Sequence, residues 1–197
     1  MISIVGFLSR SHGYAVLEEL VKRENILIKK IFTHSLNPLS QDPTRSIRND
    51  FYLFKKICDE NKIKLEKIDS KEDKNLEIPE CDYIIEVSWR YFIPKEISLK
   101  AKKKAFGIHR GKLPEYAGSE PIKQALMKNE NYIILSVHDL LAKIDMGEVI
   151  NKMKYPVNYN SNETLDENVQ RLRDEITSLF PKLIIQTLEK EESKKVI

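Results

Sequence analysis

Two stretches of the chain place a histidine at the end of an apolar run and a turn-rich segment after it. The first, FGIHRGKLPEYAGSEP, covers residues 106–121 and contains His109. The second, SVHDLLAKIDMGEVI, covers residues 136–150, with His138 near its start and Asp145 near its end. An imidazole changes charge near neutral pH, and a neighbouring carboxylate raises its basicity. His109 and Asp145 are therefore candidates for a catalytic acid–base pair.

The residues around this pair fit a binding loop, although the pattern alone leaves structural alternatives open. Gly147 follows Asp145 in the sequence DMG, and a glycine lets the backbone turn tightly beside a ligand. A strand-end histidine such as His109 or His138 could instead bond the backbone or solvent. Asp145 could be a simple turn residue.

Strand-like and helix-like segments alternate along the chain, which is typical of α/β proteins. Strands are expected at residues 2–8, 26–33, 63–68, 82–88, 105–109 and 132–138, and a last strand starts at the end of residues 139–150 and continues into 151–160. Helices are expected at residues 14–25, 45–62, 93–104, 120–130 and 164–190. The first 33 residues read as a β-α-β unit, the building block of a parallel sheet. The expected fold class is therefore α/β, an open, mostly parallel sheet with helices on both faces.

Ligands of open α/β sheets bind beyond the carboxyl ends of the strands. This rule selects the loops at residues 9–13, 33–37, 88–93, 109–118 and 138–145. The loop at 88–93 contains Trp89 and Tyr91, which could form a ligand wall or a packed anchor for the loop.

The length of 197 residues fits one domain covering residues 1–197. Within it we expect an α/β core at 1–155 and a C-terminal helical segment at 156–197. Thr164 and Glu167 form a capping box at the start of that segment, and Pro181 is expected to kink or divide it.

The composition favours a soluble globular protein and argues against several other classes. Basic residues number 33 and acidic residues 30, a net charge of +3 without a concentrated basic face, so a nucleic-acid partner is not expected. No apolar run approaches the roughly 20 residues of a membrane span, and the N-terminus makes a poor signal peptide. A cytoplasmic protein without a membrane partner is expected. Cys58 and Cys81 lack zinc-ligand spacing, so we expect no metal and two reduced structural thiols.

The stretch around His109 resembles the signature of the folate-dependent formyltransferase family, which runs roughly Asn-x-His-x-Ser-x-Leu-Pro-x-x-x-Gly-x-x-Pro. The matching residues are His109, Leu113, Pro114, Gly118 and Pro121. The second stretch resembles the second family block at its usual spacing, through Ser136, His138, Asp145 and Gly147. The likeness covers most of residues 1–155, and IFTHSLNP and VSWRYFIPKEI look most like the sugar N-formyltransferase branch. It implies a Rossmann-like formyltransferase fold.

The resemblance implies an N-formyltransferase that moves a formyl group from N10-formyltetrahydrofolate to a primary amine, here on an amino sugar and above all a nucleotide-linked one. It implies that His109 takes the amine's proton or, as imidazolium, stabilises the oxyanion, and that Asp145 holds His109 or relays the proton through water. Residues expected to contact the folate donor are Trp89, Arg90, Tyr91, Ile93, His138, Asp139 and Leu140. Residues expected on the acceptor side are Arg10, His12, Asn37, Leu113, Pro114 and Gly118.

Three positions depart from the family pattern. Gly107 replaces the Asn that holds the formyl oxygen, Gly111 replaces a Ser, and Ala117 replaces a frequent Arg. Losing an oxyanion donor costs about 10²–10³ in rate in other enzymes. One alternative is therefore a formyltransferase-like module that binds folate or nucleotide with weak or no catalysis.

Two other acceptors of the family are less expected. The chain has SRSHG where the glycinamide ribonucleotide branch has a GNGSN phosphate loop, although a divergent enzyme of that branch remains a further alternative. The carboxy-terminal tRNA-binding domain of the methionyl-tRNA branch is not expected, because the chain stops at residue 197. The apolar residues 179–188 could pack on the sheet or form a homodimer contact.

Overall fold

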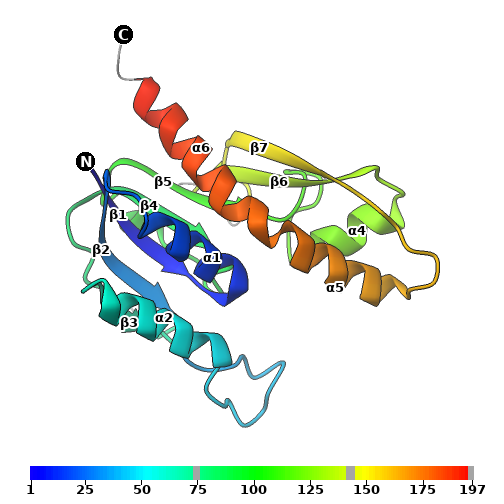
Figure 1. The fold of residues 1–197 in the computed structure, drawn as a ribbon, viewed down its shortest axis with the longest axis horizontal. Coiled ribbons are helices and arrows are strands. Elements are labelled where there is room, and N and C mark those ends of the chain that lie inside the picture. The colour runs from blue at the N-terminus through cyan, green and yellow to red at the C-terminus, as the bar shows by residue number, and fades with distance from the viewer. Residues whose placement is uncertain (73–75, 141–144, 195–197) are drawn as a thin grey trace. The chain divides into compact units, whose positions relative to one another are not determined.

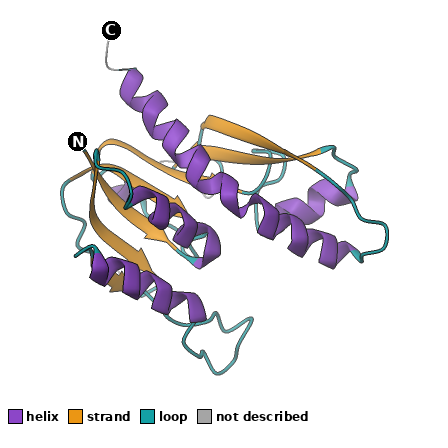
Figure 2. Cartoon of the chain, in the orientation of Figure 1, coloured by secondary structure: helices purple, strands orange, loops and turns teal. Residues whose placement is uncertain are grey.

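The computed structural model describes residues 1–72, 76–140 and 145–194. It divides into two compact units, Met1–Ala105 and Phe106–Ile197. Figure 1 labels most of their helices and strands, and Figure 2 separates them from the loops. Each unit is described by itself, and the single domain expected for residues 1–197 stays a prediction.

Four parallel strands form the sheet of the first unit (Figure 1). They are β1 (Ile2–Leu8), β2 (Ile26–Thr33), β3 (Lys64–Lys67) and β4 (Cys81–Val87), in the spatial order β3-β2-β1-β4. The chain adds β2 and β3 on one side of β1 and then β4 on the other. The order therefore reverses at β1, and such a reversal is where open α/β sheets bind their ligands.

The helices of the first unit are α1 (Arg10–Leu20), α2 (Asn49–Glu60) and the short α3 (Lys95–Ser98). Helix α1 packs on β1 and on α2. Its buried face includes Val16, Leu17 and Leu20, and the helix starts four residues earlier than expected. Helix α2 starts later than expected because Ile47, placed on its apolar face, forms a bridge with Leu36 before the helix begins.

The sheet of the second unit is antiparallel. It contains the end of β5 (Ala101–His109), then β6 (Tyr132–Asp139) and β7 (Val149–Pro156), in the order β5-β6-β7. Strand β5 begins at Ala101, so the residues 101–104 that were expected in a helix are extended. Of the strand pairs described, three are parallel and two antiparallel, which confirms a mostly parallel α/β fold with a local change of direction after β5.

The helices of the second unit are α4 (Pro121–Met127), α5 (Leu165–Glu175) and α6 (Leu179–Ser193), with a 3₁₀ turn at Ile176–Ser178 between the last two. The expected division of the C-terminal helix is confirmed. It falls at the 3₁₀ turn, and Pro181 lies in the first turn of α6, where proline is tolerated. The expected capping box is present: Thr164 accepts from the Glu167 N–H, and the Thr164 N–H donates to the Glu167 carboxylate.

Helix α6 packs on β6 and β7 within its own unit, and most apolar residues of the segment 179–188 are buried there. The expected packing of residues 179–188 on the sheet is therefore seen in the structure, and the homodimer contact stays a prediction. Both cysteines are free and buried, and burial raises the pKa of Cys58 to about 12 and that of Cys81 to about 11. Within the described ranges, no helix is long and apolar enough to cross a membrane.

Candidate active site

The carboxylate of Asp145 lies between two imidazoles in the second unit. Its Oδ2 is 3.4 Å from Nδ1 of His109, and its Oδ1 is 3.6 Å from Nε2 of His138. The backbone N–H of Gly118 donates to Oδ2 at 3.1 Å. All three acid–base side chains are largely buried, with 9%, 14% and 4% of the side chain exposed for His109, Asp145 and His138. The structure therefore brings together the pair expected from sequence, and it adds His138 to that pair.

The other ring nitrogen of His109 is bonded to the backbone. Nε2 lies 2.6 Å from the carbonyl oxygen of Tyr116. A carbonyl only accepts hydrogen bonds, so Nε2 carries a proton. His109 thus lies between the Tyr116 carbonyl, bonded at Nε2, and the Asp145 carboxylate, 3.4 Å from Nδ1.

The loop after β5 folds so tightly against His109 that Gly111 has no room for a side chain. A Cβ at this position would lie 2.5 Å from Cβ of Pro121, 2.7 Å from the Tyr116 carbonyl and 2.9 Å from Nε2 of His109. The departure from the family serine at this position thus has a steric cause in this loop conformation. The same close approach brings the Tyr116 carbonyl to the imidazole.

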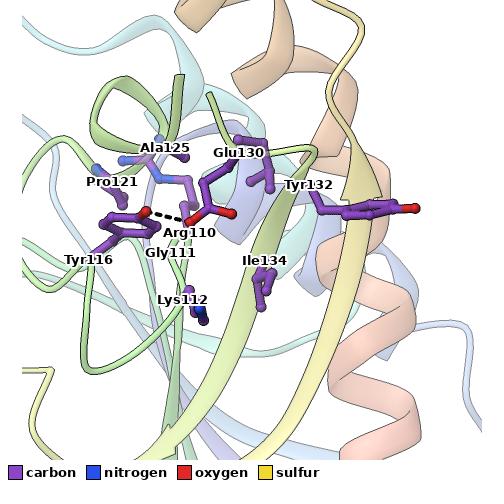
Figure 3. Close-up of a pocket in the computed structure, with 10 residues that line it drawn as sticks. Arg110, Gly111, Lys112, Tyr116, Pro121, Ala125, Glu130, Tyr132 and Ile134 are labelled. Carbon is purple, nitrogen blue, oxygen red and sulfur yellow. Dashed lines mark hydrogen bonds between the residues drawn. The ribbon is translucent and has the colours of Figure 1, made fainter. Parts of the chain in front are cut away.

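Tyr116 is anchored at its other end by Glu130. Its phenol donates to Oε1 of Glu130 at 2.6 Å, and this bond raises the pKa of Tyr116 to about 12. Figure 3 shows the two side chains facing each other across a small pocket that Gly111 and Pro121 also line. Residues of the loop after His109 therefore line part of the pocket, and the Tyr116–Glu130 bond ties that loop to the segment before β6.

The segment that carries Asp145 returns to the sheet through a backbone contact that only glycine permits. A Cβ on Gly147 would lie 1.8 Å from the carbonyl oxygen of Asp139. The Asp139 N–H donates to the Glu148 carbonyl at 3.0 Å and closes the base of this loop. Asp145 itself has a φ of 54°, a left-handed conformation that Asp tolerates better than most residues. Gly147 and the conformation of Asp145 together set the position of the carboxylate.

We expect Gly147→Ala to lower the free energy of unfolding by about 2 kcal/mol or more, because the new methyl group must displace backbone rather than a flexible side chain. Urea unfolding measures this change. Met146→Ala is the matched control, since Met146 is next to Gly147 and its side chain is exposed. Equal stability of the two variants would contradict the steric role of Gly147.

The remaining expected residues of the second unit lie around this cluster. The Leu113 N–H donates to the Ser136 hydroxyl, which in turn donates to the Gly111 carbonyl and ties the loop to β6. Pro114 is exposed and joined to Leu113 by a cis peptide bond. Gly118 contacts Asp145 through its N–H. Leu140 is half-buried at the end of β6, and residues 141–144 of the expected donor loop lie outside the described residues.

The loop after β4, in the first unit, turns its side chains toward neighbouring loops. The Trp89 ring stacks on His34 with centroids 3.9 Å apart, and the Tyr91 hydroxyl donates to the Asp69 carbonyl at 2.8 Å. The Arg90 guanidinium donates to the Leu36 carbonyl at 2.9 Å, and Ile93 is buried. Trp89, Arg90 and Tyr91 thus anchor this loop, one of the two roles left open by the sequence.

His34 is the centre of that packing and was not selected from sequence. Its Nδ1 bonds the Ile68 carbonyl, and its Nε2 accepts from the Arg90 N–H at 3.2 Å. The ring is therefore neutral, with its proton on Nδ1. Burial is the main cause that lowers the pKa of His34 to about 4.

The lowered pKa of His34 makes the folded state pH-dependent. The unfolded state binds a proton near pH 6.5 and the folded state only near pH 4, so the contribution of His34 is complete above pH 6.5 and declines as the pH falls toward 4. The total loss is about 3 kcal/mol at most. Urea unfolding between pH 4 and pH 7 should show a shallower pH dependence for His34→Gln than for the wild type. Parallel curves would rule out His34 as the titrating group.

The expected acceptor-side residues of the first unit lie in α1 and in the loop after β2. Arg10 begins α1, with a φ of 61°. His12 is buried in the same helix, with Nδ1 3.5 Å from the Ser88 hydroxyl. Asn37 bonds the Ser46 hydroxyl inside its own loop. Sequence reasoning also missed Asp69, which accepts from the N–H groups of Ser35 and Leu36, although its place just after β3 fits the strand-end rule.

The comparisons with known proteins agree with one another on the family. The profile of the family described as Formyl transferase matches residues 9–184. Among curated proteins, the methionyl-tRNA formyltransferase of Caldicellulosiruptor saccharolyticus is 24% identical over 181 residues, which covers 88% of this chain and 54% of that protein. The chain thus spans about half the length of this relative, and 36% of the Listeria monocytogenes enzyme of the same name.

Solved structures show the same fold at low identity. The phosphoribosylglycinamide formyltransferase of Brucella melitensis aligns with a TM-score of 0.69 at 15% identity, over 96% of this chain and 94% of that one. WlaRD, a sugar 3-N-formyltransferase solved in the presence of dTDP and 5-N-formyltetrahydrofolate, aligns with a TM-score of 0.61 at 18% identity, over 97% of this chain and 64% of that one. The expected Rossmann-like formyltransferase fold is confirmed.

Proposed function

Because the chain belongs to the formyl transferase family, we propose that it moves a formyl group from N10-formyltetrahydrofolate to a primary amine on an amino sugar, with a nucleotide-linked sugar as the expected acceptor. The observation that carries the activity is the Asp145 carboxylate between two imidazoles, 3.4 Å from His109 and 3.6 Å from His138. Formyl transfer between two nitrogens needs proton transfer and stabilisation of an oxyanion. Imidazole and carboxylate groups supply both, so the residues present fit a donor of this kind.

His109 and Asp145 take complementary roles in this proposal. The neutral amine attacks the formyl carbon, and negative charge develops on the formyl oxygen. His109, with the Tyr116 carbonyl bonded at Nε2 and the Asp145 carboxylate 3.4 Å from Nδ1, supplies positive charge to stabilise that oxygen. Asp145 orients the ring from Nδ1 and is itself positioned by the Gly118 N–H.

The residues that the sequence assigns to the folate donor are kept in this proposal and are given for each unit by itself. In the first, they are the loop residues Trp89, Arg90, Tyr91 and Ile93, which packing against His34 and neighbouring loops holds in place. In the second, they are His138 and Asp139 at the end of β6 and Leu140 directly after it. The acceptor is assigned to Arg10, His12 and Asn37 in the first unit and to Leu113, Pro114 and Gly118 in the second.

An amino-sugar acceptor is supported by the likeness of IFTHSLNP and VSWRYFIPKEI to the sugar branch. The structural alignment with a sugar 3-N-formyltransferase solved with dTDP is consistent with it. The test is a panel of amines incubated with N10-formyltetrahydrofolate: nucleotide-linked amino sugars, free amino sugars, glycinamide ribonucleotide and methionyl-tRNA. A formylated sugar detected by mass spectrometry is the expected product. Turnover of another acceptor alone would overturn the sugar assignment, and folate binding without any product would favour a non-catalytic module.

With an active acceptor in hand, we expect His109→Ala to lower kcat/KM by about 10²–10⁴-fold, the usual contribution of a positioned acid–base group. Asp145→Asn keeps the side-chain shape, removes the charge beside the imidazole, and should cause a loss of similar order. Asp166→Asn is the matched carboxylate control, because Asp166 is exposed and pairs only with Lys123 among the contacts described. Full turnover by His109→Ala would exclude the proposed mechanism.

A further inference from the structure

His138 lies on the same face of the sheet as His109, opposite a glycine. In the β5–β6 ladder Gly107 pairs with His138, and His109 pairs with Ser136. Side chains two residues apart on a strand, and those of directly paired residues, share one face. The two imidazoles are therefore diagonal neighbours. No β5 side chain stands directly opposite His138, because that position is Gly107.

The β6–β7 ladder shifts register between Val137 and His138. Irregularities of this kind re-aim a side chain and are common beside active sites. Ser136 lies two residues before His138 on the same face of β6, and its hydroxyl proton is already used, since it donates to the Gly111 carbonyl at 2.7 Å. His138 is thus the side chain of β6 that faces the Asp145 carboxylate and has a ring nitrogen directed at it.

The two histidines differ in where their protons lie. Nδ1 of His138 is 3.2 Å from the carbonyl oxygen of Asp139, so this nitrogen donates and carries the proton. In the neutral ring, the lone pair is then on Nε2. Burial, the largest cause, lowers the pKa of His138 and favours this neutral form, while the Asp139 carbonyl and the Asp145 charge act in the opposite direction. His109, by contrast, has an acceptor at each ring nitrogen.

The 3.6 Å gap between Nε2 of His138 and Oδ1 of Asp145 is too long for a good hydrogen bond but well within the range of an ion pair. The lone pair of Nε2 therefore faces a carboxylate without sharing a proton with it. A proton that reached Nε2 would convert this contact into an attractive ion pair. The geometry thus gives His138 an unused proton-accepting site with a counter-charge already in place.

We propose that His138 is a second catalytic residue of the formyl transfer, which takes a proton from the attacking amine at Nε2 and returns it to the departing nitrogen. This inference rests on the function proposed above. It gives His138 a chemical role in place of the donor-binding role expected from sequence. It also gives the two imidazoles different roles, since His109 keeps its protons and supplies charge whereas His138 transfers a proton.

The proton and the bonds balance within this step. The amine nitrogen forms a bond to the formyl carbon, and the carbonyl π electrons move to oxygen, which gives an ammonium and an oxyanion. His138 Nε2 takes one proton from the ammonium. The oxyanion then re-forms the carbonyl, the bond from carbon to the donor nitrogen breaks, and that nitrogen receives the proton from Nε2. His138 returns to its neutral form, so no other reactant is required.

The first test needs no activity. Nitrogen-15 NMR of the histidine-labelled wild-type protein, with its four histidines assigned from single variants, reports the protonation of each ring nitrogen. At pH 7 we expect His138 to be neutral, with its proton on Nδ1 and none on Nε2. A proton on Nε2, in either the other tautomer or the imidazolium, would overturn the proposal.

The second test separates chemistry from donor binding. For His138→Gln we expect kcat to fall by about 10²–10⁴-fold, with the KM for N10-formyltetrahydrofolate within a few-fold of wild type. A rise in that KM with kcat retained would return His138 to a binding role. Tyr132→Phe is the control, since Tyr132 is exposed on the same strand and keeps its ring in this variant. Added imidazole should restore part of the kcat of His138→Gly, which a purely structural defect would not allow.

The two tests also distinguish this inference from the proposed function. If the wild type formylates no acceptor in the panel, the proposed function fails, whereas the NMR result still decides the protonation of His138. If the wild type is active and His138→Gln keeps its kcat, only the inference fails.

Discussion

The candidate site depends on the placement of one carboxylate, that of Asp145. Its two oxygens face different imidazoles, and a backbone N–H from Gly118 fixes one of them. A carboxylate that is 14% exposed keeps its charge only where donors or cations surround it. His109 and the Gly118 N–H provide that environment. The loop after β5 and the segment before β7 must therefore meet at Asp145, and this requirement shapes the backbone of both.

Backbone approach, more than side-chain chemistry, accounts for the glycines around the site. Gly111 lets the Tyr116 carbonyl reach His109, and Gly147 lets the chain pass the Asp139 carbonyl after Asp145. A methyl group at either position would overlap neighbouring atoms rather than fill an empty space. The absence of the family serine at position 111 is thus coupled to the hydrogen bond that the imidazole makes. The conformation of the loop and the proton at Nε2 of His109 therefore depend on each other.

The strand ends and the pairing of His109 with Asp145 could be predicted from sequence, because apolar runs, turn residues and a two-block motif are all local signals. The Thr164–Glu167 capping box was predictable for the same reason. The antiparallel direction of β6 and the Tyr116 carbonyl contact were not, since they depend on how the chain returns to the sheet. His34 lies in the strand-end loop at residues 33–37, but its role comes from Trp89 and Ile68, which are far from it in sequence.

The histidines of this protein show how the same side chain acquires different chemistry from its neighbours. A backbone carbonyl at Nδ1 keeps the proton of His34 there, and its Nε2 accepts from a backbone N–H, so this ring has no proton-accepting site left. His138 has the same carbonyl contact at Nδ1, but its Nε2 faces a carboxylate. The neutral ring of His138 therefore lies next to the Asp145 carboxylate, whose negative charge would stabilise its protonated form. A buried base of this kind gives up little hydrogen bonding when it takes a proton, which is the property that general-base catalysis requires.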